Sequence, residues 1–290
     1  MKADLLRAWA PPAKVQTYDS RDSMLYALSI GLGRDPMDPR ALPFVYEKDQ
    51  QAFPCMAAIL ATPGFWMRDH PEFEIDHRRI VHGEQHLRLY ADLPPSGSVS
   101  GQTRIARIID KGPGKPAIIH AVRELSNCEN GSKIAAVEQV YVYRGGGGFS
   151  QEGDHSDGPA TAPEPAPDRR PDRVLTFQTR ADSALLYRLS GDYNPLHADP
   201  EVARQAGFER PILHGLASYA MVAKSILWDV ADGDVRTLRA YSARMSAPAL
   251  PGDMFEIRCW IDNPCEITFE VAVPDRDVVI LGGGKMVLGQ

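Results

Sequence analysis

Hydrophobic and polar residues alternate over eight stretches of the chain, a pattern typical of β-strands. Glycine, proline and asparagine turn signals separate the stretches. They lie at residues 84–93, 97–111, 116–128, 133–144, 235–248, 253–262, 266–274 and 278–289. Each group of four follows a run of small and apolar residues with helical character, at 53–65 and at 214–231. The pattern predicts an α+β protein of two similar units, in which each antiparallel sheet wraps a helix.

Between the two units, the composition changes abruptly over residues 144–173 to glycine, proline, alanine and charged residues. Such a segment offers almost nothing to a hydrophobic core and is typical of an exposed, flexible linker. We therefore expect a first half at residues 1–144, a linker at 145–172 and a second half at 173–290.

The start of each half carries a similar short sequence. With one gap, Tyr26-Ala-Leu-Ser matches Tyr187-Arg-Leu-Ser, which we interpret as an internal duplication; a chance match is the alternative. In this alignment Gly31 takes the position of Asp192, and no histidine follows it at the spacing of His197. Ionisable groups in one copy alone predict one working site and one degenerate site.

Composition excludes several classes of protein. The 290 residues are 43% hydrophobic and 24% charged, and no run approaches the roughly 20 apolar residues of a membrane span. The net charge of −6 leaves no general basic surface for nucleic acid. Four cysteines without a Cys-x-x-Cys pair predict free thiols rather than disulfides or a structural zinc site. Because neither a secretory signal nor a Ser-Lys-Leu ending is present, we expect a cytoplasmic protein.

The sequence Asp192-Tyr-Asn194-Pro-Leu-His197 permits two interpretations. Asp, Asn and Pro are turn formers, and Asp199 followed by Pro200 suits the cap of a following helix. Alternatively, a carboxylate and an imidazole held by a rigid turn converge on one water molecule and transfer its proton, with Asn194 as support. From the residues alone the two interpretations are evenly balanced.

A second candidate element is Arg-Pro-Ile-Leu-His-Gly-Leu-Ala-Ser at residues 210–218. Here the backbone N–H of Gly215 precedes an apolar helix, and the unpaired donors at a helix N-terminus suit the oxyanion of a thioester or ester. A glycine used as a cap or for close helix packing is the alternative, and for an isolated glycine it is the more common one.

The stretches YRLSGDYNPLHADPEVARQAGF and PILHGLASYAMVAK together closely resemble the signature of MaoC-like, type-2 (R-specific) enoyl-CoA hydratases. The resemblance covers the whole chain. It implies a double hot dog fold, with two antiparallel sheets each wrapped around a central helix. It also implies the addition of water to a trans-2-enoyl-CoA to give a (3R)-3-hydroxyacyl-CoA, in fatty acyl or steroid side-chain degradation.

The same resemblance assigns roles to individual residues. Asp192 and His197 match the pair that activates water, and Asn194 matches the residue that supports this pair. Gly215 matches the backbone donor to the thioester oxygen. The further matches are His82 and Gly83 as acyl-CoA contacts, Lys111 as a CoA-binding lysine, and Met245 where the family usually has an aromatic residue at the substrate site. No metal or redox cofactor is implied, coenzyme A is part of the substrate, and a homodimer is expected. We expect residues 44–65 to shape the acyl pocket.

Two other functions remain open at this point. One is a hot dog thioesterase, in which a carboxylate activates water to cleave the acyl-CoA and release a thiol. The other is an acyl-CoA binding protein without turnover, which would explain the apolar helices but not the ionisable pair in the second half.

Overall fold

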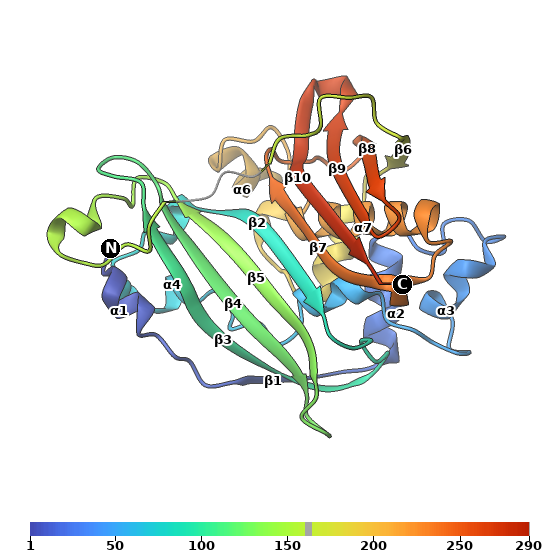
Figure 1. Cartoon of the computed structure of the whole chain (residues 1–290), viewed down its shortest axis with the longest axis horizontal. Coiled ribbons are helices and arrows are strands. Elements are labelled where there is room, and N and C mark those ends of the chain that lie inside the picture. The colour runs from blue at the N-terminus through green and yellow to red at the C-terminus, as the bar shows by residue number, and fades with distance from the viewer. Residues whose placement is uncertain (160–163, 290) are drawn as a thin grey trace.

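The computed structural model describes residues 1–159 and 164–289. Its ten strands form one antiparallel sheet in the order β1-β3-β4-β5-β2-β7-β10-β9-β8-β6 (Figure 1). The strands are β1 Lys14–Tyr18, β2 Ile80–Leu89, β3 Gly97–Asp110, β4 Ala117–Asn127, β5 Lys133–Tyr143, β6 Arg173–Gln178, β7 Leu238–Met245, β8 Met254–Asn263, β9 Glu266–Val273 and β10 Val278–Leu288. All eight predicted strands are present, and the short edge strands β1 and β6 are additional.

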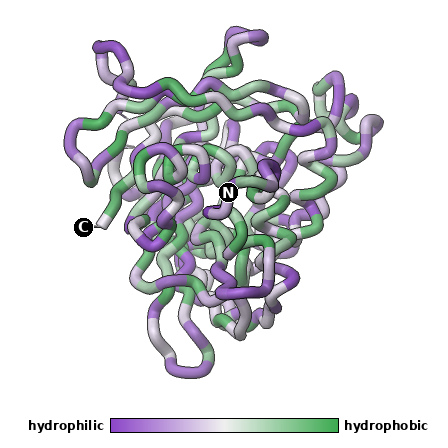
Figure 2. The backbone as a smooth tube through the Cα atoms, turned by 90° about the vertical axis from the view of Figure 1, so that its right-hand side faces the viewer, coloured by the Kyte–Doolittle hydropathy of each residue, from purple (hydrophilic) through white to green (hydrophobic). Residues whose placement is uncertain are grey.

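The two halves are joined through their sheets. Strands β2 and β7 pair from Glu84 with Arg244 to Arg88 with Ala240, so the expected two sheets form one continuous surface. The α+β prediction is confirmed. Hydrophilic backbone stretches lie mainly at the outer loops in Figure 2.

The helices are short except for one. They are α1 Ala3–Arg7, α2 Ser20–Ser29, α3 Leu42–Val45, α4 Trp66–Asp69, α5 Ser183–Tyr187, α6 Pro200–Gln205 and α7 Gly215–Val230. Helix α7 is the helix predicted for the second half, and most of its first three turns are buried within the main core. Within the described residues, no helix is both long and apolar enough to cross a lipid bilayer.

The helix predicted at 53–65 is wrong. Only a five-residue 3-10 helix, η2 (Pro54–Ala58), forms there, and all five of its residues are buried. Pro54 provides no N–H for a preceding turn, and Pro63 followed by Gly64 interrupts the other end of the run. The first half therefore surrounds a short compact segment where the second half surrounds a helix of 16 residues.

The duplicated starts of the two halves lie against each other. The rings of Tyr26 in α2 and Tyr187 in α5 are 5.9 Å apart between centroids. Each helix is followed by a glycine with positive φ, Gly31 at +91° and Gly191 at +120°. By backbone conformation Gly31 thus corresponds to Gly191, not to Asp192 as the sequence alignment had it. The position of Asp192 then falls on Leu32, a buried residue that offers no chemistry.

Part of the expected linker packs against the first half, although more than half of its described residues are exposed. Phe149, in the 3-10 helix Phe149–Glu152, is buried in the smaller core of the first half. The Asp157 carboxylate accepts a hydrogen bond from the Ile108 N–H at 2.7 Å and pairs with Arg7. The prediction of an exposed linker is therefore wrong at Phe149 and Asp157, because these side chains contact the first half, whereas residues 150–153 are exposed as predicted. Residues 160–163 lie outside the described residues.

All four cysteines are free thiols, as predicted. Cys55 and Cys259 are buried, and burial raises the pKa of Cys259 to about 12. These two thiols therefore act as small apolar groups of the core.

Candidate active site

The loop after α5 is built by the turn residues that the sequence indicated. The Asn194 N–H donates to Asp192 Oδ1 at 3.2 Å, and Asn194 Oδ1 accepts from the Leu196 N–H at 3.1 Å. Pro195 begins a 3-10 helix that ends at His197. Asp199 then caps α6 by accepting from the Glu201 N–H at 2.8 Å. The turn interpretation is confirmed, and the same turn sets the positions of Asp192 and His197.

His197 is held as a neutral base. Its Nδ1 lies 2.9 Å from the Ile212 carbonyl oxygen, and because a carbonyl only accepts, Nδ1 carries the proton. The other ring nitrogen, Nε2, therefore offers a lone pair. Burial lowers the pKa of His197 below 6.5, an effect that the Ile212 carbonyl and the Asp192 carboxylate partly oppose. The imidazole is consequently uncharged at neutral pH.

His214 completes the cluster, although the sequence analysis singled out only the glycine after it. Its ring stacks on His197, with centroids 3.7 Å apart and planes inclined by 25°. Its Nε2 donates to the backbone oxygen of Asp192 at 3.2 Å. Burial, reinforced by the neighbouring His197, lowers the pKa of His214 to about 4. The sequence signal that could have identified His214 as a site residue is its position directly before an apolar helix, where a side chain faces the helix N-terminus.

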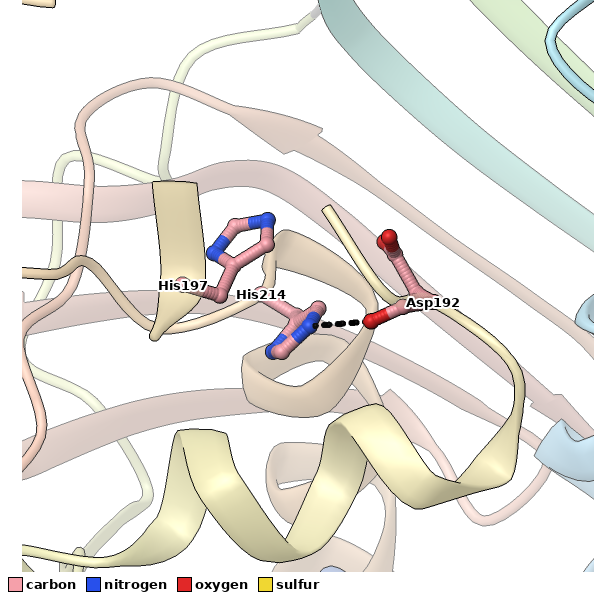
Figure 3. Close-up of side chains that lie close together, drawn as sticks. All are labelled: Asp192, His197 and His214. Carbon is pink, nitrogen blue, oxygen red and sulfur yellow. Dashed lines mark hydrogen bonds between the residues drawn. The ribbon is translucent and has the colours of Figure 1, made fainter. Parts of the chain in front are cut away.

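The three side chains converge in one place, as Figure 3 shows. One possible ligand atom from each of Asp192, His197 and His214 lies within 4.8 Å of the others. Both imidazoles are buried, whereas Asp192 is exposed. Two neutral imidazoles and a carboxylate can bind and deprotonate a water molecule, and the same three groups are also a donor set that metal ions accept.

Gly215 begins α7 beside this cluster. Its N–H is one of the donors that a helix leaves unpaired, at the end where the macrodipole favours negative charge. A Cβ built on Gly215 would lie 3.7 Å from the Met245 side chain, so Met245, the last residue of β7, covers this point. The structure thus brings both predicted residues to the helix end that adjoins the cluster.

The first half contributes His82, on β2. Its Nε2 donates to the Glu84 carbonyl at 3.0 Å. Burial lowers the pKa of His82 to about 4, and the Asp192 carboxylate partly opposes this shift, which places the two side chains within electrostatic reach. Gly83 lies at a bulge against β5, where a Cβ would come within 2.8 Å of the Val142 side chain. Gly83 is therefore required by close packing, and its contact with acyl-CoA stays a prediction.

Lys111 lies outside the cluster. It is exposed in the turn after β3, three strands away from β2. The register that joins Asp110, Ala117, Tyr143 and Ile80 puts it at the same end of the sheet as His82. At about 4.8 Å per strand, Lys111 is roughly 14 Å across the sheet from His82. A contact with coenzyme A at this distance stays a prediction.

Two family descriptions divide the chain between them. Residues 16–145 match the MFE-2 hydratase 2 N-terminal domain, and residues 160–280 match the MaoC like domain. An enoyl-CoA hydratase of Mycobacterium tuberculosis is 35% identical, over 97% of this chain and 96% of its own length. The chain belongs to the MaoC-like enoyl-CoA hydratase family. A second family member, the peroxisomal enoyl-CoA hydratase 2 of Arabidopsis thaliana, is also 35% identical, over 97% of this chain and 94% of its own.

Two solved structures agree with this fold. A MaoC-like dehydratase from Phytophthora capsici superimposes with a TM-score of 0.84 at 28% identity, covering 100% of this chain and 99% of its own. A Mycobacterium tuberculosis protein described as a double hotdog fold gives a TM-score of 0.58 at 14% identity, covering 97% and 94%. The predicted double hot dog fold is confirmed.

Proposed function

We propose that this protein is an (R)-specific enoyl-CoA hydratase, a hydro-lyase that adds water to a trans-2-enoyl-CoA to give a (3R)-3-hydroxyacyl-CoA. One observation carries the proposal: the Asp192 carboxylate and the neutral His197 converge beside the first N–H of α7. Relatives named enoyl-CoA hydratase that align along nearly the whole chain support it.

The geometry suits a single bound water molecule. Asp192 and Nε2 of His197 both accept hydrogen bonds, so one water donates a proton towards each of them. Its oxygen attacks C3 of the substrate while one proton moves to Asp192 and the electron pair of the double bond shifts towards the thioester oxygen. C2 then takes up that proton, and the second hydrogen stays on the new hydroxyl group. Such proton transfer contributes roughly 10² to 10⁴ in rate.

Negative charge develops on the thioester oxygen during the attack. The Gly215 N–H would donate to that oxygen, assisted by the α7 dipole, and a donor of this kind contributes on the order of 10² to 10³ in rate. His214 acts as a positioning residue, because it stacks on His197 and holds the Asp192 backbone. Asn194 has a similar positioning role through its hydrogen bonds within the turn.

The test is a direct assay with trans-2-enoyl-CoA esters of graded length and bulk. Hydration removes the enoyl absorbance without releasing a thiol, and chiral analysis should find the (3R) product. Release of free coenzyme A at the same rate as substrate loss would instead indicate the thioesterase. Stoichiometric binding with no change in absorbance would indicate the binding protein.

We further propose that the reaction uses no metal or redox cofactor. Hydration changes no overall oxidation state, and the two imidazoles already have carbonyl partners that set their tautomers. Exhaustive dialysis against a chelator should leave the hydration rate unchanged. Loss of activity that a single divalent metal restores would make Asp192, His197 and His214 metal ligands instead.

A cytoplasmic homodimer is the proposed cellular form. The resemblance to the family supports the dimer, which sedimentation over a range of protein concentrations would test. Several relatives are named as peroxisomal, so fractionation of the source cells is the measurement that decides the location. A net charge of −6 leaves no general basic surface for nucleic acid, and the proposed partner is an acyl-CoA thioester because relatives of this chain are named enoyl-CoA hydratases.

A further inference from the structure

The inner face of the first half, the face that η2 covers, carries polar side chains. Residues paired across an antiparallel sheet share a face, so the register joins Thr103, Arg123 and Val137 in one row. The next row towards the active site contains Ala121, Gln139 and Gln85. The row after that contains Ile119, Tyr141 and His82, the last of which is within electrostatic reach of Asp192. A band of polar groups thus runs from the active site into the first half.

Three atoms of this band lack hydrogen-bond partners among the described residues. They are Gln85 Oε1, Thr103 Oγ1 and Arg123 Nε, and each belongs to a residue that is at most 4% exposed. Buried polar atoms are normally paired, because leaving one unpaired costs roughly 1 to 3 kcal/mol. The hydrogen bonding of the polar band is therefore incomplete among the described residues.

Arg123 is the strongest member of the band. It is 2% exposed, and the hydrogen bond that its guanidinium makes is donated by Nη2 to the Ala58 carbonyl at 2.7 Å. No carboxylate of residues 1–159 and 164–289 pairs with it, although arginine is almost never buried without an anionic partner. Burial lowers the pKa of Arg123 to about 10, so the group is still charged at neutral pH.

The surroundings of Arg123 accommodate its long side chain. A Cβ at Gly101 would come within 2.9 Å of Arg123 Cδ, so the glycine leaves the space that the arginine occupies. Tyr141 and Gln139, between Arg123 and the active site, are only partly buried, in contrast to the apolar positions around α7. The middle of the polar band is therefore less tightly covered than the core around α7.

We propose that the first half binds an acyl chain with a carboxylate at its far end, and that Arg123 is the ion-pair partner of this carboxylate. The inference rests on the proposed hydratase function and names its substrate class. Thr103, directly across from Arg123, would donate a second hydrogen bond. From His82, Arg123 is roughly 13 Å along the strands and about 10 Å across them, a separation that an acyl chain of medium length spans.

The experiment compares matched pairs of trans-2-enoyl-CoA esters of equal length, one ending in a methyl group and one in a carboxylate. With the unaltered protein, kcat/KM for the carboxylate-terminated CoA ester should exceed that for the methyl-terminated CoA ester by at least about tenfold at the best length, as expected for a charge-assisted hydrogen bond. A third substrate, in which the terminal carboxylate is esterified with methanol, keeps both oxygens but not the charge and should lose this advantage.

Substitutions at Arg123 test whether this residue causes the preference for the carboxylate-terminated substrate. In Arg123→Met, the ratio between carboxylate and methyl-terminated substrates should fall to about one, while Arg123→Lys should retain part of it. Arg104→Met, an exposed arginine on the outer face of the neighbouring strand, is the matched control and should keep the full ratio. If Arg123→Met does not fold, two measurements still test the inference. They are the substrate preference of Thr103→Val and the comparison of the substrate pairs with the unaltered protein.

Equal or better turnover of the methyl-terminated ester at every length would overturn the inference. So would stabilisation by chloride or acetate without any preference for the carboxylate ester, because the buried charge would then serve a free anion. If neither ester is hydrated, the hydratase proposal itself fails, and that result is distinct from hydration without preference.

Discussion

The two halves of the molecule share one sheet but cover it differently. In the second half, the 16-residue helix α7 lies on inner positions that are apolar, such as Phe255, Ile257 and Phe269. In the first half, a five-residue 3-10 helix takes that place, and the inner face includes Thr103 and Arg123. A helix of 16 residues provides a macrodipole and free N–H groups, and a single short turn does not. The catalytic cluster accordingly lies at the start of α7.

The comparison also explains why the duplication does not produce two sites. Gly31 and Gly191 both end a helix with positive φ, so the local backbone is shared. In the second half the next residue is the exposed Asp192, and in the first half it is the buried Leu32. The first half keeps the turn but has no carboxylate at this position, and it brings His82 within electrostatic reach of Asp192 instead.

The largest expected effect is catalytic and falls entirely in the second half. Asp192→Asn and His197→Ala should each lower kcat for enoyl-CoA hydration by at least about a hundredfold, because each removes a proton-handling group. Asp199→Asn is the matched control, since Asn caps a helix as well as Asp does. Circular dichroism should show that all three variants are folded. Near-normal turnover in either catalytic variant would remove that residue from the mechanism.

Acid should destabilise the protein through its buried histidines. In the folded state the pKa of His214 is about 4, below its ordinary value of 6.5, so the unfolded chain binds more protons between these values. Stability is therefore lost as the pH falls from about 6.5 to about 4, by about 3 kcal/mol for this residue, with little further loss below. Urea denaturation at neutral and acidic pH measures the loss, and His214→Gln should reduce it.

The same experiment on His82→Gln tests the first half. His82 has a similarly lowered pKa, so its replacement should also reduce the acid sensitivity. Unchanged acid sensitivity in both variants would show that other groups govern the acid transition.

A smaller effect is expected for substrate binding by the first half. His82→Asn should raise KM about tenfold and change kcat less, because His82 is within electrostatic reach of Asp192 and the proposal gives it a contact with the acyl-CoA. His86→Asn, on the outer face of the same strand, is the control. Steady-state kinetics would separate the two constants. A loss of kcat as large as that expected for His197→Ala would show that the first half also contributes a catalytic group. It would contradict the assignment of catalysis to the second half alone.

The smallest effect compares the two covering segments directly. Ala223 in α7 and Ala57 in η2 are both fully buried, so replacing either with glycine removes a similar methyl contact. Ala223→Gly carries the additional cost of glycine inside an α-helix, about 1 kcal/mol, which a short 3-10 turn largely avoids. Urea denaturation of the pair should show Ala223→Gly as the less stable variant. Equal losses would mean that η2 depends on helical propensity as much as α7 does.

The sequence predicted the strands well because alternation over a half-buried sheet is a local property. It missed β1 and β6, which are short edge strands with little alternation of their own. The helix at 53–65 was wrong because apolar composition alone cannot distinguish a buried 3-10 turn from a helix, and Pro54 and Pro63 were given too little weight. The packing of Phe149 and Asp157 within the expected linker was not predictable, because the residues that hold them are distant in sequence.

For the site, the local turn was predictable and the partners across the fold were not. Asp192, Asn194 and His197 lie within six residues, so the turn chemistry of Asn and Pro already relates them. His214 and His82 enter only through folding: the first stacks on His197 from the start of α7, and the second comes from the other half of the chain.

The sequence by itself determined the strand pattern, the turn from Asp192 to His197 and the helix that begins at Gly215, because these depend on neighbouring residues. Only tertiary contacts join the two sheets at β2 and β7, make the stacked histidines neutral, and bury Arg123 without a carboxylate partner among residues 1–159 and 164–289. Burial and long-range pairing set these properties, since desolvation of a group depends on everything that packs around it.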